Sequence, residues 1–476
     1  RVIGIGIDTT GSTPIPIAKN GTPLGMLQKF KSNLNAHAWL WKDHTSHEEA
    51  AEITQKSQAS GVPYLSKCGG TYSSEWFWSK IWHCQRVAPE VFSEAYSWVE
   101  LADFVPAYIT GNLTPSKIIR GICAAGHKAM FSDTWGGLPD RKFLSSLSPQ
   151  LAGLRNRLYE RAVPSDQTAG LLTNNVARKV GLPTGIPVAV GAFDAHMGAV
   201  GSGVKPGTLV KIIGTSTCDI MAVPQRRSIP DIPGLCGIVP GSVIPGMTGL
   251  EAGQSAVGDI FNWFVTQLCP STYANGNPHY RLTKEGEKLR PGESGIMALD
   301  WNNGNRTILV DPLLSGLLIG QTLHTTAPEI YRALIEATAF GALTIIRRLE
   351  EYGVKVKEVI NCGGIAEKNP FVMQIYADVC NRPMKISRSS ESCALGAAVF
   401  GAVVGGAYRN TREAQRSMTG IKSQEFRPRK TRSVIYGKLY AIYQTLHDAF
   451  GTSCFTGNLE RAMKDLIEIR DQVRKK

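Results

Sequence analysis

Several patterns that would assign a function directly are missing from this sequence. It contains no GxxxxGK[ST] phosphate loop, no GxGxxG after a strand, no HExxH and no GxSxG. Its ten cysteines form no CxxC pair and no Cys/His spacing typical of a metal site. These absences argue against P-loop NTPases, dinucleotide-binding enzymes of the GxGxxG type, zinc peptidases and α/β-hydrolases.

Long apolar runs are also missing. The nearest, over residues 394–407, is shorter than a membrane-spanning helix requires, and the first residues show no signal-peptide pattern. Four cysteines lie in apolar or Gly/Ala surroundings, as reduced core residues do: Cys123, Cys218, Cys362 and Cys393. We therefore expect a cytoplasmic location and no membrane partner.

Length and composition indicate a globular protein with two domains, or three. The chain has 476 residues, of which 43% are hydrophobic, 19% are charged and 49 are glycine. The net charge of +13 favours anionic ligands, but the basic residues are dispersed. The one dense run, Arg427–Arg432, is interpreted as solvated surface, so no nucleic-acid partner is expected.

The most informative stretch is Ile186–Ala222. A buried-strand pattern at Ile186–Val190 leads to Asp194, which is expected where a strand gives way to a loop, and a small-residue helical segment follows over Met197–Gly203. A second strand, Leu209–Ile213, opens into Gly-Thr-Ser-Thr and continues into a third over residues 220–223. Such a hairpin presents backbone N–H groups and hydroxyls to phosphate oxygens. A carboxylate nearby predicts acid–base chemistry beside a phosphoryl donor.

Two further stretches have open interpretations. Val2–Ile7 is expected to be a strand that ends at Asp8–Thr13, which either forms another phosphate hairpin or lines a cleft. Lys128, among small residues, either holds an anion or hydroxyl or lies at the surface, and Glu251 contacts either a ligand hydroxyl or the backbone. The helically spaced Trp76, Trp78 and Trp82 are expected in the core.

The second half alternates helices and strands. A long helix is predicted over residues 328–352, a strand over 356–361, a helix over 370–380, a strand over 384–386 and a small-residue helix over 394–405. Gly363 and Gly364 stand between a strand and a helix, where a backbone can approach a nucleotide closely. Without a P-loop, this glycine pair and the hairpin favour the actin/hexokinase type of ATPase.

Five segments resemble the FGGY carbohydrate kinases over nearly the whole chain: AFDAHMGAVGSG, GTSTCDIM, PGMTGLEAGQSAVGDIFNWF, CGGIAEKNPFVMQIYADV and SCALGAAVFGAV. WLWKDH, CGGTYSSEWFWSKI and CAAGHKAMF resemble the branch that phosphorylates L-ribulose in L-arabinose catabolism. The resemblance implies an α/β protein with two actin-like (ribonuclease H-like) domains and a cleft between them. The expected domains are residues 1–203 for the sugar and 204–450 for ATP, with a helical tail over 451–476.

The resemblance also implies functional residues. Asp194 matches the catalytic base, and Lys128, Glu251 and the strand end at Gly11 match the sugar site. Six residues match the ATP site: Gly214, Thr215, Ser216, Gly363, Gly364 and Asn369. ATP and Mg²⁺ are the expected cofactors, with no metal ligand assigned, and a homodimer is one expectation.

The start of the chain departs from the family pattern. The family opens with a strand pair that carries Asp-x-Gly-Thr, whereas Arg1 matches a strand roughly 80 to 100 residues further on, so the chain is expected to begin inside a domain and to be catalytically poor. The alternatives are therefore a non-catalytic sugar or nucleotide sensor, or a kinase of the branches that act on xylulose or D-ribulose.

Overall fold

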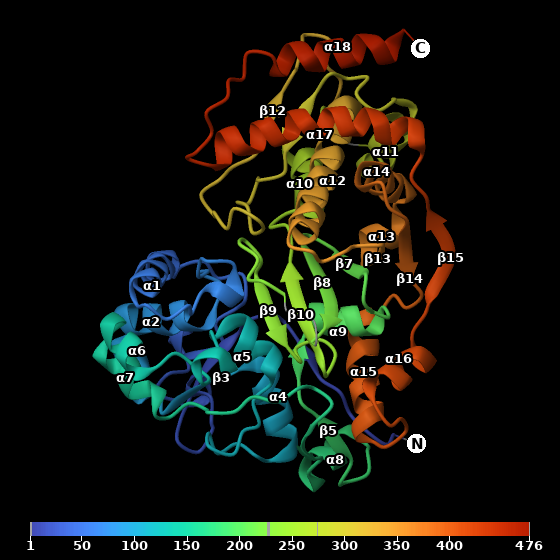
Figure 1. Ribbon diagram of the computed structural model, residues 1–476. Helices are drawn as coiled ribbons and strands as arrows, with labels where there is room; N and C mark the ends of the chain where they lie inside the picture. Colours follow the sequence, from blue (N-terminus) through green and yellow to red (C-terminus); the bar gives the residue numbers. More distant parts are fainter. Residues whose placement is uncertain (1, 226–228, 274, 476) are drawn as a thin grey trace. The chain divides into compact units, whose positions relative to one another are not determined.

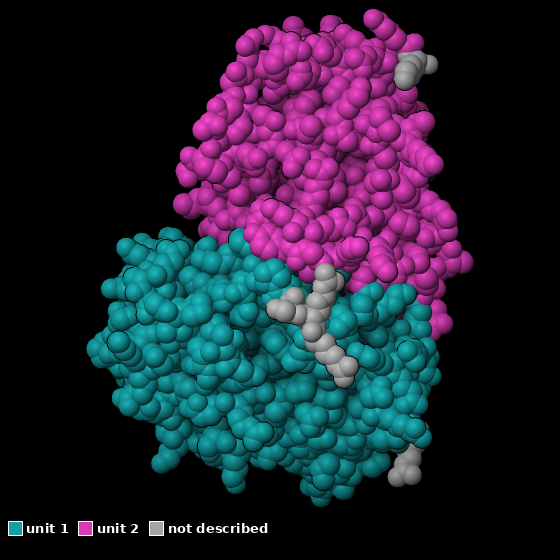
Figure 2. Space-filling model, in the orientation of Figure 1, with its two compact units in different colours: residues 1–206, 220–251, 391–420 teal, residues 207–219, 252–390, 421–476 magenta. Residues whose placement is uncertain are grey.

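The computed structural model describes residues 2–225, 229–273 and 275–475, and divides the chain into two compact units. Unit 1 contains residues 1–206, 220–251 and 391–420, and unit 2 contains residues 207–219, 252–390 and 421–476. Figure 2 shows unit 1 in teal and unit 2 in magenta. Within the described ranges, no helix has both the length and the apolar character needed to cross a membrane.

Unit 1 combines short strands with many helices. Its strands are β1 (Asp8–Thr9), β2 (Pro14–Ile17), β3 (Ser97–Glu100), β4 (Thr168–Leu171), β5 (Pro187–Ala189), β6 (Ala192–Phe193), β8 (Thr217–Pro224, from residue 220 on), β9 (Gly237–Pro240) and β10 (Met247–Ala252). Its helices are α1 (His47–Ala59), α2 (Phe77–Val87), α3 (Pro89–Glu94), α4 (Leu101–Thr110), α5 (Ile122–Lys128), α6 (Arg141–Leu147), α7 (Pro149–Arg155), α8 (Asn174–Val180), α9 (Asp194–Gly201), α15 (Ser392–Val404) and α16 (Thr411–Met418).

An aromatic core lies beneath α2 of unit 1. Trp76, Trp78 and Trp82 are all buried there, as their helical spacing predicted, and they share one cluster with Trp39 and Trp98. Large aromatic side chains dominate the burial energetics of such a cluster. This core therefore holds α2 in a fixed position.

The strand predicted at Val2–Ile7 is wrong in its extent. Regular strand structure is confined to β1, whose Asp8 and Thr9 pair in parallel with Ala192 and Phe193 of β6. Upstream, Ile5 forms an isolated β-bridge with Val188. In this bridge the Ile5 N–H donates to the carbonyl of Pro187. Pro187 has no N–H to extend that ladder.

Helices α9 and α15 of unit 1 pack against each other through glycine (Figure 1). A Cβ built on Gly396 would lie 1.8 Å from the carbonyl oxygen of Met197, and one on Gly201 would lie 2.0 Å from that of Ser392. Both clashes are with backbone, which cannot rotate away. The small residues in these two segments therefore set the helix separation, which fixes α9 and the Asp194 at its first turn.

Replacing Gly396 by alanine is expected to lower the free energy of unfolding by about 3 kcal/mol, because overpacking against backbone forces the helices apart. Urea unfolding followed by circular dichroism measures the change. Gly153→Ala is the matched control, since that helical glycine has open space around it, and it should be neutral or stabilise by about 0.5–1 kcal/mol. Equal behaviour of the two variants would contradict the close packing.

Unit 2 is built on a sheet with strand order β15-β14-β13-β7, followed by the first residues of β8. Strands β7 and β13 pair in parallel, as do β13 and β14, whereas β15 is antiparallel. Its strands are β7 (Thr208–Ile213), β11 (Met297–Leu299), β12 (Leu317–Ile319), β13 (Glu358–Cys362), β14 (Met384–Ser387) and β15 (Ile421–Phe426), and its helices are α10 (Gly258–Trp263), α11 (Pro278–Lys288), α12 (Ala327–Glu351), α13 (Gly364–Lys368), α14 (Pro370–Cys380), α17 (Lys430–Gly451) and α18 (Ala462–Arg474).

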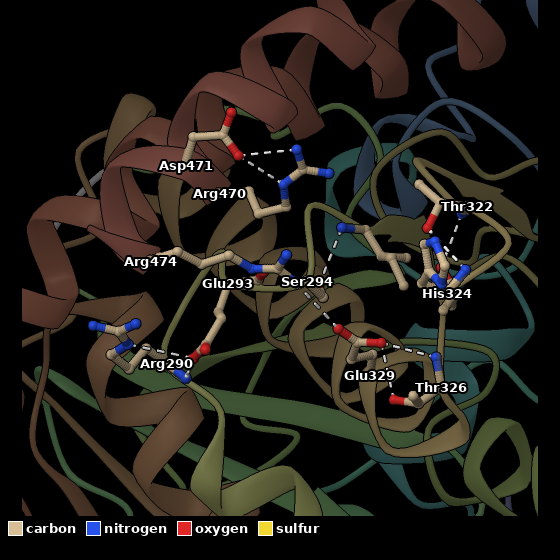
Figure 3. A network of polar contacts seen from close by, with 12 residues as sticks. Arg290, Glu293, Ser294, Thr322, His324, Thr326, Glu329, Arg470, Asp471 and Arg474 are labelled. Atoms are coloured by element: carbon tan, nitrogen blue, oxygen red, sulfur yellow. Dashed lines mark hydrogen bonds and ion pairs between the residues drawn. The ribbon is translucent and has the colours of Figure 1, made fainter. Parts of the chain in front are cut away.

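Helix α12 of unit 2 begins at a capping box. The Glu329 carboxylate accepts a hydrogen bond from the Thr326 backbone N–H at 2.8 Å, which satisfies a donor at the helix start. Arg474 of α18 lies 3.7 Å from the same carboxylate and donates to the carbonyl of Glu293 at 3.1 Å (Figure 3). The last helix is therefore attached to the start of α12.

Candidate functional site

Asp194 opens helix α9 directly after strand β6, so the strand leads into a helix rather than the predicted loop. Its carboxylate accepts a hydrogen bond from the Ala195 N–H at 2.7 Å. Exclusion of solvent by the surrounding protein raises the pKa of Asp194, and the negative charges of Asp8 and Glu251 add to this effect. A raised pKa improves a carboxylate as a proton acceptor near neutral pH.

Lys128 and Glu251 form a buried ion pair in unit 1. Lys128 ends α5, Glu251 lies on β10, and the ammonium nitrogen is 2.7 Å from Oε1 of the carboxylate. Burial alone would raise the pKa of Glu251, but Lys128 and the adjacent imidazoles hold it well below its usual range. Glu251 is therefore an ionised hydrogen-bond acceptor inside the protein. Of the two interpretations of Lys128, the surface one is excluded, because the residue is buried.

Two histidines beside Glu251 were missed by sequence reasoning. Nδ1 of His127 lies 3.0 Å from Oε2 of Glu251, and Nε2 of His196 lies 3.8 Å from the same atom. The centroids of the two rings are 4.5 Å apart. Burial lowers the pKa of both imidazoles. The available signals in the sequence were their positions: His127 directly precedes Lys128, and His196 stands two positions after Asp194.

The loop after β1 places Gly11 directly before a backbone segment that two buried side chains hold. The Glu100 carboxylate accepts hydrogen bonds from the Ser12 hydroxyl and the Thr13 N–H, both at 2.7 Å. The ammonium of Lys80 donates to the carbonyl of Ser12 at 2.9 Å, and burial lowers the pKa of Lys80 to about 8. These contacts fix the backbone on the C-terminal side of Gly11.

Gly214, Thr215 and Ser216 form the turn between β7 and β8, as the hairpin pattern predicted. The N–H of Gly258 donates to the Gly214 carbonyl at 3.1 Å, and the Val257 N–H donates to the Thr215 carbonyl at 2.8 Å. The start of α10 thus holds the carbonyl oxygens of the turn, while Gly214 and Thr215 remain exposed. A turn with its acceptors engaged and its hydroxyl exposed suits an anion.

A buried polar network lies below this turn, entirely within unit 2. Lys211 donates to Asp219 at 2.8 Å and to Oε1 of Gln254 at 3.0 Å. Nε2 of Gln254 donates to Asp300 at 2.7 Å. The two strands of the hairpin are therefore joined by charge as well as by backbone hydrogen bonds.

The glycine pair opens helix α13. Gly363 has φ +95°, and a Cβ there would lie 2.4 Å from the carbonyl oxygen of Ile213, so only glycine fits. Gly364 faces open space. Asn369 caps α14 by accepting the Val372 N–H at 3.2 Å, so it has a structural role in addition to the predicted one.

The sequence-predicted site residues fall into two sets. Gly11, Lys128, Asp194 and Glu251 lie in unit 1. The other six lie in unit 2: Gly214, Thr215, Ser216, Gly363, Gly364 and Asn369. Within unit 1 the structure brings Lys128 and Glu251 together, while the convergence of Asp194 and Thr215 on one cleft stays a prediction.

Comparison with protein families gives two matches that together span most of the chain. Residues 1–201 match the FGGY family of carbohydrate kinases, N-terminal domain, and residues 209–405 match its C-terminal domain. The chain is 45% identical to a ribulokinase from Vibrio parahaemolyticus over 463 residues, covering 94% of this chain and 82% of the relative. It is 42% identical to a ribulokinase from Halalkalibacterium halodurans, covering 94% and 80%.

Solved structures agree in fold. A xylulose kinase from Rhodospirillum rubrum superposes with a TM-score of 0.75 at 23% identity, covering 94% of this chain and 85% of that one. A glycerol kinase from Plasmodium falciparum gives a TM-score of 0.72 at 16% identity, covering 93% and 83%. At these identities the likeness establishes the α/β fold alone.

Proposed function

The chain belongs to the FGGY family of carbohydrate kinases, and we propose that it transfers the γ-phosphoryl group of ATP to the terminal hydroxyl of L-ribulose. The observation that carries the choice of sugar is the similarity to ribulokinases at 40–45% identity over most of the chain. Residues 1–203 are the proposed sugar-binding domain, 204–450 the ATP-binding domain and 451–476 a helical tail.

Asp194 is the proposed general base. Its carboxylate accepts the proton of the terminal sugar hydroxyl as the hydroxyl oxygen attacks the γ-phosphorus and the bond to the β-phosphate oxygen breaks. The raised pKa of Asp194 supports this role, because it brings the acceptor closer to the pH at which the reaction runs. The proton stays on the carboxyl group of Asp194, and ADP leaves with the bridging oxygen.

Lys128, Glu251 and Gly11 are the proposed sugar-binding residues. The ionised Glu251 carboxylate is suited to accept hydrogen bonds from sugar hydroxyls, and Lys128 is suited to donate one. The fixed backbone beside Gly11 supports close approach of the sugar. Buried polar groups of this kind reject a substrate whose hydroxyls point elsewhere, since a group left unpaired costs about 1–3 kcal/mol.

Gly214, Thr215 and Ser216 are the proposed phosphate-binding turn, and Gly363, Gly364 and Asn369 the proposed adenosine site. The exposed hydroxyl of Thr215 and the open space at Gly364 support these assignments. When bound, Mg²⁺ would neutralise charge on the phosphate oxygens. Asp8, whose negative charge raises the pKa of Asp194, offers a carboxylate oxygen of the kind that Mg²⁺ prefers and would hold it.

A coupled ADP-release assay with ATP, Mg²⁺ and a panel of ketopentoses tests the function. We expect ADP release that depends on sugar, with a higher kcat/KM for L-ribulose than for D-ribulose or xylulose. A preference for another ketopentose would contradict the assignment of the sugar. Binding of sugar or nucleotide without turnover would contradict the kinase activity and favour a sensor.

A further inference from the structure

Three buried ligand atoms converge in unit 1 without making hydrogen bonds in the described part of the chain. They are Nδ1 of His127, Nε2 of His196 and Oε2 of Glu251. One ligand atom from each of these residues lies within 4.8 Å of the other two. Polar atoms buried in this way normally have a partner, since an unsatisfied one costs about 1–3 kcal/mol. The convergence of three such atoms on one point indicates a missing partner that all of them share.

The contacts around His127 are compatible with a cation as the missing partner. The Ser242 hydroxyl lies 3.0 Å from the Val239 carbonyl and 2.9 Å from Nε2 of His127. In the tautomer that donates from Nε2 to this hydroxyl, Nδ1 of His127 carries a lone pair and faces a carboxylate oxygen of Glu251 at 3.0 Å. A cation bound between these two atoms would satisfy both of them.

We propose that His127, His196 and Glu251 form a binding site for a divalent transition-metal ion, with Zn²⁺ the best match. Two histidine nitrogens and one carboxylate oxygen are a common ligand set for zinc with an open fourth position. Bonds of about 2.0–2.2 Å at a tetrahedral angle separate ligand atoms by about 3.3 Å. The observed separations of 3.0 and 3.8 Å from Oε2 to the two nitrogens lie on either side of that value.

Two of the three ligands, His127 and Glu251, have the supporting contacts of a metal site, whereas Nδ1 of His196 has no hydrogen-bond partner among the described residues. Ser242 orients the His127 ring through its second nitrogen, and Lys128 holds the other oxygen of Glu251 at 2.7 Å. Gly237 leaves the space that His127 occupies, because a Cβ there would lie 1.8 Å from Nδ1. Imidazole nitrogens favour Zn²⁺ over Mg²⁺, which prefers oxygen ligands.

This site has a consequence for catalysis that rests on the proposed function. Glu251 is the proposed acceptor for a sugar hydroxyl, so an ion bound to its Oε2 and the sugar would compete for the same carboxylate. Micromolar Zn²⁺ is then expected to raise the KM for L-ribulose and to leave the KM for ATP nearly unchanged.

Metal binding itself is tested without any activity measurement. The chain, in a Cys454→Ser background that removes its exposed cysteine, is titrated with Co²⁺ and followed by its visible absorption, with Zn²⁺ then displacing the Co²⁺. We expect one equivalent with the intense spectrum of a tetrahedral site, unaffected by excess Mg²⁺. His127→Asn and His196→Asn should each weaken binding by at least about 100-fold, and Ser242→Ala by about 10-fold.

His83→Asn is the matched control. His83 also lies 3.0 Å from a glutamate, Glu49, but that contact is a complete hydrogen bond, so this variant should bind Co²⁺ like the parent. Absence of a tetrahedral spectrum in the parent, or unchanged binding in the folded His127 and His196 variants, would overturn the proposal. A bound Co²⁺ that L-ribulose fails to displace would support the metal site and contradict the sugar-binding role of Glu251.

Discussion

Asp194→Asn is expected to reduce sugar-dependent ADP formation by about 10³-fold while nucleotide affinity stays nearly unchanged. Asparagine has almost the same volume and can still accept the Ala195 N–H, so the start of α9 should keep its structure. What it cannot do is accept the proton of the attacking hydroxyl. The kcat in the coupled assay and the Kd for ADP, measured by calorimetry, separate these two effects.

Asp140→Asn is the control for this substitution. Asp140 also stands at the start of a helix in unit 1, where it accepts the Phe143 N–H at 2.7 Å, and its replacement should leave kcat unchanged. Because the pKa of Asp194 is raised, kcat should fall with decreasing pH at a pH above the usual range of an aspartate. Full activity of Asp194→Asn would remove Asp194 from the mechanism.

The elements that the sequence predicted well are those with strong local signals. Residues 370–380 match α14 at both ends, because Pro370 marks its first turn and Asn369 its cap, and residues 328–352 match α12 within one residue. The strand predicted at Val2–Ile7 shows the limit. A Cβ on Gly6 would lie 1.7 Å from the Ala397 carbonyl oxygen of α15, so this segment is shaped by a helix about 390 positions away.

The residues of the candidate site also differ in how far local sequence signals could predict them. The proposed phosphate-binding turn is local, so the pattern of strand, Gly-Thr-Ser-Thr and strand was sufficient to predict the turn itself. The His127, His196 and Glu251 cluster joins α5, α9 and β10, and its two histidines give no pattern of their own. Only the pairing of β9 with β10 brings Gly237 opposite Glu251, and Gly237 in turn makes room for His127.

The second large effect is expected at the base of the proposed phosphate-binding turn, where Lys211 and Asp219 are both almost fully buried. Burial raises the pKa of Asp219 even with the ammonium of Lys211 at 2.8 Å. Removing one partner of a buried pair leaves an uncompensated charge and costs about 3–5 kcal/mol. Lys211→Met should lower the free energy of unfolding by that amount and weaken ATP binding, because Lys211 also holds Gln254.

The double variant Lys211→Met/Asp219→Leu tests whether charge is the cause. Two apolar side chains of similar volume leave no unpaired carboxylate, so the double variant should recover most of the lost stability. The single variant should also be pH-dependent. Without Lys211, the pKa of Asp219 in the folded protein lies further above its value in the unfolded chain than it does in the parent. The folded state of the single variant is therefore favoured at low pH and loses stability as the pH rises. Urea unfolding at pH 5 and pH 8 measures this difference. If the double variant loses as much stability as the single variant, and the loss does not depend on pH, the packing of the lysine side chain supports the turn and its charge does not.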